Sequence, residues 1–149
     1  MIIHTNRLKV NACTPECLST IPTGAYNIGD HIKAHVAELQ NDDSLLGWGP
    51  YFVVEKETNQ IVGDIGFKGK PSLEFTVEIG YGIIPDAQNK GYATEATRAL
   101  VEWAFASGQV KKVNAECLHD NIASMKVLER LGMKRIGQEG NLMKWELTK

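Results

Sequence analysis

Hydrophobic and polar residues alternate most regularly between Leu73 and Ile84. Successive side chains of a β-strand point to opposite faces, so this alternation predicts a strand with one apolar and one polar face. The apolar face would carry Phe75, Val77, Ile79, Tyr81 and Ile83. Gly80 and Gly82 fall on the other face near the strand's end, where glycine is typical of a bulge or a close backbone approach.

Three segments repeat hydrophobic residues every three or four positions, which is the period of an amphipathic helix. The first runs from Asp30, the expected N-cap, to about Gln40, with Ile32, Val36 and Leu39 on one face. The other two run from Tyr92 to Ala106 and from Asn121 to Leu131.

Shorter apolar runs predict the remaining strands. They are Leu8 to Val10, Tyr51 to Glu55, Ile61 to Phe67, Val113 to Leu118, Met133 to Ile136 and Leu142 to Leu147. A turn-rich stretch is expected from Thr14 to Gly24. Strands dominate the first half and alternate with helices in the second, which predicts an α/β fold with a mixed sheet and helices packed on its faces.

Length and composition fit a compact globular protein. The 149 residues, 43% hydrophobic and 23% charged, predict a single domain over residues 1–149. A net charge of -2 with scattered Lys and Arg argues against a nucleic-acid partner.

Cysteine usage and the N-terminal sequence bear on the compartment. Three cysteines, Cys13, Cys17 and Cys117, are an odd number, which favours a reducing compartment. Neither a cleavable leader nor an apolar run of about 18 residues is visible, so we expect a cytoplasmic protein that does not span a membrane.

The junction between the predicted strand and the second helix has the features of a phosphate site. The chain passes from Pro85 to Lys90, reaches Gly91 and enters a helix. The first amides of a helix lack internal acceptors, and the helix dipole adds partial positive charge, so an anion binds well there. The loop contains neither G-x-x-x-x-G-K-[ST] nor G-x-G-x-x-G, which sets aside the two common phosphate-binding motifs.

The sequence of this loop resembles the signature Q/R-x-x-G-x-G/A of the Gcn5-related N-acetyltransferase (GNAT) superfamily. The residues that match it are Gln88, Asn89, Lys90, Gly91, Tyr92 and Ala93. The flanking runs, Glu78 to Pro85 and Lys90 to Ala96, are similar to the branch containing the ribosomal-protein N-terminal acetylases. A second match, Asn121-Ile-Ala-Ser124, follows downstream, and the whole resemblance is best from Tyr51 to Leu147.

The resemblance implies the GNAT fold, a mostly antiparallel sheet splayed near Gly80 to Gly82, and acetyl-CoA as co-substrate. It implies that the amides of Asn89 to Thr94 hold the pyrophosphate and that Ile83 and Ile84 pair with the pantetheine arm through their backbone. A primary amine, on a protein or peptide N-terminus or on a small molecule, would attack the thioester directly in a ternary complex. Lys126 and Arg130 are candidates for the nucleotide's 3′-phosphate, although both also fit a solvated surface.

An alkyl ammonium has a pKa near 10.4 and needs a base before it can attack at neutral pH. Glu78 is the first candidate, acting through a water, and Glu74 is a weaker one. The oxyanion donor is expected to be a backbone amide near Ile83 or Ile84. Members of the family often carry a tyrosine seven residues after the asparagine, but this chain has Leu128 there.

That departure leaves Ser124 as the hydroxyl expected near the sulfur and Asn121 as an orienting residue in the cofactor site. Asn121 also fits a plain N-cap. The missing tyrosine keeps open an alternative function, a module that senses acyl-CoA without turnover. An exposed strand edge at the C-terminus could support pairing into a homodimer. His31 and His35, at i and i+4, lack a third ligand, so no metal site is expected and a solvated helix face is favoured.

Overall fold

The computed structural model describes residues 1–22, 24–84 and 87–149. Its strands are β1 (Ile2–His4), β2 (Leu8–Ala12), β3 (Pro50–Glu55), β4 (Ile61–Phe67), β5 (Thr76–Ile83), β6 (Lys112–Leu118), β7 (Lys134–Glu139) and β8 (Leu142–Thr148). Its helices are α1 (Pro15–Ser19), α2 (Asp30–Leu39), α3 (Tyr92–Ala106) and α4 (Ile122–Arg130), with a 3-10 turn, η1 (Asp43–Leu45).

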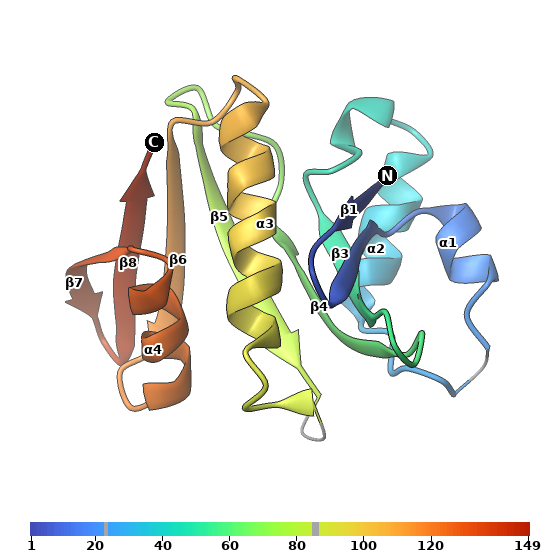
Figure 1. Ribbon diagram of the computed structural model, residues 1–149. Helices are drawn as coiled ribbons and strands as arrows, with labels where there is room; N and C mark the ends of the chain where they lie inside the picture. Colours follow the sequence, from blue (N-terminus) through green and yellow to red (C-terminus); the bar gives the residue numbers. More distant parts are fainter. Residues whose placement is uncertain (23, 85–86) are drawn as a thin grey trace.

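The strands of the described residues form one sheet in the order β1-β2-β3-β4-β5-β6-β8-β7 (Figure 1). Only β5 and β6 run parallel, and the other neighbours are antiparallel. The parallel pair is joined through α3, as a parallel connection requires. This confirms the predicted mixed, mostly antiparallel sheet.

Helices cover both faces of this sheet, because neighbouring strand residues point to opposite sides. In β3, Tyr51 and Val53 belong to the core beneath α3, whereas Phe52 packs with Ile32 and Val36 of α2. Figure 1 shows α3 and α4 in front of the sheet and α2 behind it. The first face is called the α3 face below, and the second the α2 face.

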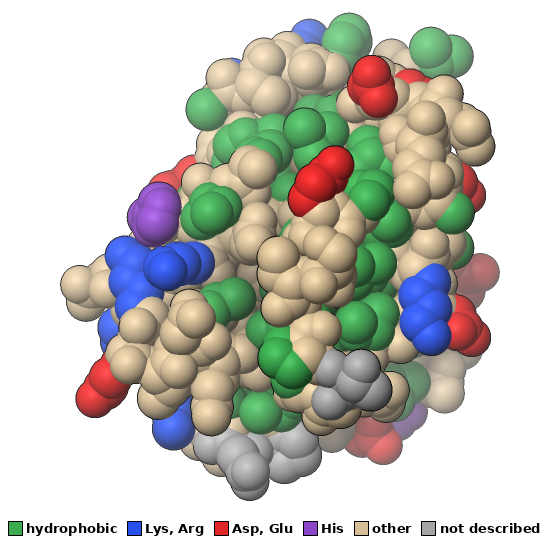
Figure 2. Space-filling model, turned by 90° about the vertical axis from the view of Figure 1, so that its right-hand side faces the viewer, with side chains coloured by type: hydrophobic (Ala, Val, Ile, Leu, Met, Phe, Trp, Pro, Cys, Tyr) green, Lys and Arg blue, Asp and Glu red, His purple; other side chains and the backbone are tan. Residues whose placement is uncertain are grey.

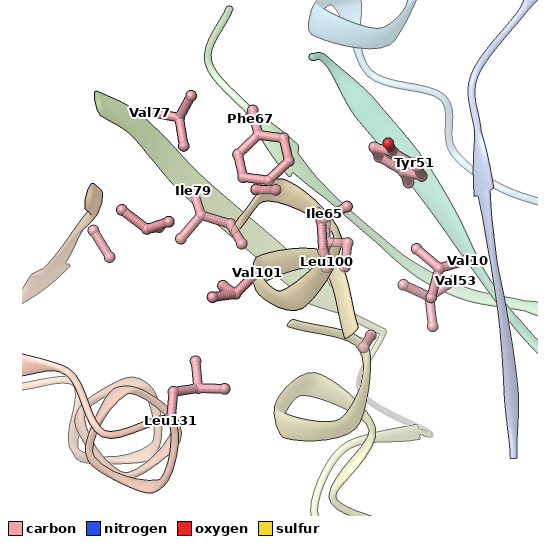
Figure 3. Packing of buried hydrophobic residues seen from close by; sticks show 14 of the residues in the cluster. Val10, Tyr51, Val53, Ile65, Phe67, Val77, Ile79, Leu100, Val101 and Leu131 are labelled. Carbon is pink, nitrogen blue, oxygen red and sulfur yellow. The ribbon is translucent and has the colours of Figure 1, made fainter. Parts of the chain in front are cut away.

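The larger core lies between the sheet and α3 (Figure 3). Strand residues such as Ile65 and Ile79 point toward Leu100 and Val101 of α3, and all four are at most 4% exposed. Full burial of an aliphatic side chain contributes about 1.5–3 kcal/mol, so this packing fixes α3 against the strands that carry the candidate site.

The three predicted helices are confirmed within one or two residues, and the apolar stripe of α2 is buried as expected. The N-cap of α2 is Gly29, not Asp30, and Gly29 makes no side-chain cap bond. The helices are short enough that, among the described residues, none has the length and apolarity needed to cross a bilayer.

The strongest predicted strand begins later than its sequence pattern suggested. β5 starts at Thr76, while Leu73 is fully exposed and Phe75 has a left-handed φ of 60° and is 45% exposed. A turn at Ser72, whose carbonyl accepts from the Phe75 amide, rotates Phe75 off the core face. Gly80 and Gly82 form no bulge either, because the β4–β5 register runs without a shift.

Two elements near the N-terminus were missed. β1 is only three residues long and pairs with β2 alone, so its pattern is too short to read. α1 lies in the stretch expected to be turns, yet it carries a readable signal: Thr14 accepts from the Cys17 amide as N-cap, and Pro15 opens the helix.

The molecule's side nearest the N-terminal strands is shown in Figure 2. Lys and Arg side chains gather mainly at the left margin of this view, beside a histidine, and hydrophobic side chains run down its middle.

At the other end of the sheet β7 forms an edge whose residues are all exposed, including Ile136 at 54%. The predicted C-terminal edge therefore exists, although β7 rather than the last strand supplies it.

Candidate functional site

The loop before α3 presents backbone amides to solvent. Gly91 is the N-cap of α3 with φ 80°, and Asn89 also has a left-handed φ, of 63°. The helix makes its first backbone bond from the Glu95 amide to the Gly91 carbonyl, 3.0 Å away. The amides of residues 92–94 consequently have no acceptor among the described residues, so the predicted anion site has the necessary donors. Pro85 and Asp86, which lead into the loop, lie outside the described residues.

Arg7 ties this loop to the N-terminal strands. Its Nη1 donates to the Lys90 carbonyl at 2.7 Å, its Nε pairs with Glu95 at 2.8 Å, and its guanidinium lies 4.6 Å from the centre of the Tyr92 ring. Thr5 also donates to Glu95. These hydrogen bonds lower the pKa of Glu95, although its partial burial alone would raise the pKa.

Sequence reasoning missed this contact. No local pattern in the sequence pairs Arg7 with a glutamate 88 residues away. The acidic residue in the first turn of α3 was the available signal, because a carboxylate there usually marks a stabilised helix start.

A cavity of about 530 Å³ adjoins the same helix start. It is lined by His4, Thr5, Gly91, Thr94, Glu95, Arg98, Ala99, Glu102 and Arg130. The Thr94 hydroxyl oxygen is buried without a hydrogen-bond partner, and Arg98 is held by the Arg130 carbonyl at 2.9 Å. Two guanidinium groups beside free helix amides suit a ligand with several phosphate groups. Lys126 does not line this cavity.

The parallel pair β5–β6 separates halfway along. Its register runs from Thr76↔Lys112 to Ile79↔Ala115 and stops there, although β5 continues to Ile83 and β6 to Leu118. Figure 1 shows the two strands diverging toward these ends. We call the unpaired part, Gly80–Ile83 opposite Glu116–Leu118, the β5–β6 split. It lies where the family resemblance implied a splayed sheet.

Backbone groups on one edge of β5 face the β5–β6 split. The Glu78 carbonyl accepts from Lys68, the residue after β4, and the Ile84 amide donates to Val62 of β4. Backbone groups alternate sides along a strand, so Tyr81 and Ile83 direct theirs away from β4. The Ile83 carbonyl accepts from the Gln88 side chain at 2.9 Å. Both backbone groups of Ile84 already have partners, since its amide donates to Val62 and its carbonyl accepts from Ala87. Of the two isoleucines predicted to meet a ligand through the backbone, Ile83 is the available one.

The start of α4 borders the α3 side of the β5–β6 split. Asn121 caps this helix by accepting from the Ser124 amide at 3.1 Å, which confirms its capping role. The Tyr81 hydroxyl donates to the Ser124 carbonyl at 3.3 Å, and burial raises the pKa of Tyr81. Leu128 is 1% exposed in the core, so the helix offers no phenol at that position.

On the α2 face, β4 and β5 form the floor of a second cavity, of about 650 Å³. The cross-strand pairs Asp64 with Gly82 and Gly66 with Gly80 make this floor, and Lys68, whose amide donates to the Glu78 carbonyl, continues it. Its other walls come from α2 and from the segment Leu45–Pro50. We call this cavity the trough. The glycines leave the centre of the trough without side chains. Two residues along the strands, about 7 Å away, lie Asp64 in one direction and Glu78, the partner of Lys68, in the other.

Glu78 does not line the trough itself but adjoins one end of it through Lys68, and its carboxylate is not free. Its Oε2 accepts from Lys68 Nζ at 2.5 Å, and its side chain is 31% exposed. Glu74, the weaker carboxylate candidate, precedes β5 and is exposed. Sequence reasoning placed Glu78 on the correct face but had no means of finding its partner.

At the other end, Asp64 accepts from the Tyr26 hydroxyl at 2.7 Å and lies 3.0 Å from His31 Nε2. His31 and His35 both line the trough. The expected solvated helix face is therefore wrong for His35, which is half-buried there, while the His31 side chain is 62% exposed. The described residues gather no group of three potential metal ligands.

Comparisons with known proteins agree with this geometry. The family model described as an acetyltransferase (GNAT) domain matches residues 6–134. The chain is 36% identical over 94 residues to the uncharacterised N-acetyltransferase YjdG of Bacillus subtilis, covering 63% of this chain and 56% of YjdG. It is 31% identical over 86 residues to a ribosomal-protein-serine acetyltransferase of Escherichia coli, covering 58% of this chain and 48% of that protein. The matches thus span about half the length of these relatives.

A solved structure gives the same fold. RimL, a ribosomal L7/L12 α-N-protein acetyltransferase in complex with coenzyme A, superposes with a TM-score of 0.79 over 99% of this chain and 98% of that one, at 16% identity.

Proposed function

We propose that this chain, which belongs to the GNAT acetyltransferase family, binds acetyl-CoA and transfers its acetyl group to a primary amine. The observation that carries the proposal is the β5–β6 split. It begins beside Gly80, on the floor of the trough, and its α3 side is bordered by the start of α4. A thioester placed there would meet an acceptor in the trough.

The phosphate groups of the co-substrate belong at the start of α3. The amides of Asn89 to Thr94 would donate to the pyrophosphate, with Gly91 allowing close approach. Gln88 would position the loop through its bond to Ile83. Arg98 and Arg130 in the adjoining cavity suit the nucleotide's additional phosphate.

The co-substrate supplies an acetyl group on a thiol whose pKa, near 8.5, lets it depart as a thiolate with modest help. The carbonyl of Ile83, which accepts from Gln88 and has a second lone pair, would pair with the pantetheine arm at the open edge of β5. The Ile83 amide is then the best-placed oxyanion donor, because the Ile84 amide is bonded to Val62. Ser124 would lie near the sulfur at the start of α4, and Asn121 holds that turn in place.

An acceptor amine fits the trough electrostatically. Asp64 and Glu38 line it, while the cation Lys68 is matched by Glu78. The carboxylates therefore favour an ammonium group over an anion. Glu78, acting through a water, is a candidate to accept the amine's proton. To do so it must share its carboxylate with Lys68.

The acceptor class follows from the relatives only as a proposal. The α-amine of a protein or peptide is favoured, because the coenzyme A-bound neighbour is an α-N-protein acetyltransferase by name. A small amine is the second candidate. Thiol release with a serine-initiated hexapeptide but not with spermidine would support the first, and the reverse would support the second.

A non-catalytic acyl-CoA sensor remains the alternative function, motivated by the buried Leu128. It predicts tight acetyl-CoA binding without thiol release in the presence of either amine.

Calorimetric titration with acetyl-CoA tests the cofactor site. Wild type should bind with micromolar affinity, and Gly91→Asp should lose binding because a carboxylate would repel the pyrophosphate. Gly91→Asn is the matched control, since asparagine has the same shape, lacks the charge and tolerates the left-handed backbone found here.

Binding retained by Gly91→Asn and lost by Gly91→Asp would assign the effect to charge. Equal loss in both would point instead to crowding of the added Cβ, which would lie 3.3 Å from Arg7 Nη2. A folded wild type that does not bind acetyl-CoA would refute the proposal.

A further inference from the structure

We propose that His35, rather than Glu78, accepts the proton from the acceptor amine. The inference rests on the proposed function and concerns the trough. His35 belongs to α2 and is half-buried in the wall of this cavity. The structure describes no hydrogen bond to its ring, in contrast to His31, which is held by Asp64.

His35 packs against glycine residues, which have no side chain to displace its ring. A Cβ added to Gly49 would lie 2.2 Å from His35 Nδ1 and 2.6 Å from Nε2, so the ring rests directly on that glycine. A Cβ added to Gly66 would lie 2.3 Å from the Gly49 carbonyl oxygen. Gly66 in turn pairs with Gly80, the first residue beyond the last β5–β6 pair. His35 thus adjoins the centre of the trough, next to the β5–β6 split.

The charge of the surrounding groups matters for a base that must be neutral before it acts. The titratable residues that line the trough besides His35 come from α2, from β4 and the residue after it, and from β5, while the Leu45–Pro50 wall contributes none. They are His31, Glu38, Asp64, Lys68 with its partner Glu78, and Tyr81, whose hydroxyl donates to the Ser124 carbonyl. Asp64 is engaged by His31 and Tyr26, and Glu78 by Lys68.

Burial lowers the pKa of His35 from its ordinary value of 6.5, with Glu38 acting in the opposite direction. The imidazole is therefore largely neutral at pH 7 and able to take a proton. Glu78 would first have to give up or share its lysine partner. This difference ranks His35 above Glu78 as the proton acceptor.

Proton transfer to His35 comes before acetyl transfer. The ammonium N–H bond breaks, and the proton goes to a ring nitrogen of His35. The neutral amine attacks the acetyl carbon, so that a C–N bond forms while the C–S bond breaks and its electron pair leaves on sulfur. The second proton lost by the nitrogen goes to that sulfur, leaving an amide, a thiol and a protonated His35.

The test is the pH dependence of kcat at saturating amine, measured by thiol release with the serine-initiated hexapeptide and with spermidine. In wild type kcat should fall as the pH drops through the pKa of His35, below 6.5, because the protonated ring cannot accept a proton. His35→Gln should lower kcat at pH 7.5 by about 100-fold or more and abolish this acidic limb. Glu78→Gln should retain the limb.

Two further variants separate chemistry from structure. Gly49→Ala keeps the histidine but displaces its ring, and should lose rate in the same direction. His31→Gln changes the other histidine of α2 and should keep the acidic limb even if the rate changes. In His35→Gln the melting temperature and the acetyl-CoA Kd should match wild type, since the His35 ring has no described hydrogen bond and lines the trough, not the cavity at the start of α3.

An unchanged acidic limb in His35→Gln, or its loss in Glu78→Gln, would overturn the inference while leaving the proposed function intact. Absence of turnover by a wild type that binds acetyl-CoA would overturn both and favour the sensor. A wild type that fails to bind acetyl-CoA would refute the cofactor proposal itself.

Discussion

Glycine residues of the trough differ in what a side chain would meet, although the sequence presents them alike. A Cβ on Gly82 has nothing within 4 Å, whereas one on Gly66 would strike the backbone of Gly49 and Pro50 at 2.3–2.8 Å. Neither has a left-handed backbone. One glycine therefore leaves room for a ligand, and the other permits two chain segments to touch.

Gly82→Ala and Gly66→Ala should consequently behave differently. Gly82→Ala should leave the free energy of unfolding unchanged or raise it by about 0.4–1 kcal/mol, and should raise KM for the amine because its methyl group enters the trough. Gly66→Ala should destabilise the protein by about 1–3 kcal/mol through overpacking against backbone. Urea unfolding and amine kinetics on both variants check this.

The acetyl-CoA Kd of Gly82→Ala serves as the control and should equal that of wild type. Equal destabilisation by the two substitutions would contradict the geometry of the trough floor.

At the scale of elements, the position of α3 depends on a contact outside the core. Glu95 in its first turn receives hydrogen bonds from Thr5 and from the backbone and side chain of Arg7. Arg7 also holds the Lys90 carbonyl. The same residues thus join β2 to the helix and fix the shape of the loop that presents free amides.

This contact makes part of the stability dependent on pH. The pKa of Glu95 is lower in the folded protein than in the unfolded chain, so its contribution is present above the unfolded value, near 4.3, and is lost as the pH falls through the folded value. Glu95→Gln should cost about 1 kcal/mol at pH 7, because the pair is partly exposed. The cost should shrink toward pH 4.

Urea unfolding at pH 7, 5 and 4 measures this difference. Glu102→Gln, on the same helix and without a described partner, is the control and should differ little from wild type at every pH. A pH-independent cost for Glu95→Gln would show that its charge is not what secures α3.

At the scale of the whole molecule, the sheet is continuous through β5 and β6 at one end and open at the other. Residues up to Ile79 and Ala115 are paired, and the backbone of Tyr81 and Ile83 faces the β5–β6 split. The two cavities lie on opposite faces, one with residues of α3 and the other with residues of α2 in its wall. This division keeps the proposed phosphate site apart from the proposed amine site.

Hydrogen exchange followed by NMR should detect the open segment. The amides of Tyr81 and Ile83 should exchange quickly in the free protein and slow markedly when acetyl-CoA is bound, because the bound co-substrate would supply their partners. Val77 and Ile79, paired with β6, should be protected in both states. Equal protection of all four amides in the free protein would mean that the strands do not part in solution.

Most elements could be predicted from the sequence, because helix and strand periods depend on residues a few positions apart. Such patterns predicted α2, α3 and α4 and the alternation of strands and helices along the second half of the chain, and also the loop at Gly91. Where local signals were short or mixed, at β1 and at the start of β5 near Phe75, the prediction failed or shifted.

The sequence by itself determined most of the elements, the position of the helix-start loop and the face on which Glu78 lies. Only the tertiary structure decided which residues meet: Arg7 with Glu95, Lys68 with Glu78, and His35 with Gly49. The first of these contacts joins residues 88 apart. Such pairings are set by strand register and by the packing of helices on a sheet, and no local period in the chain encodes either.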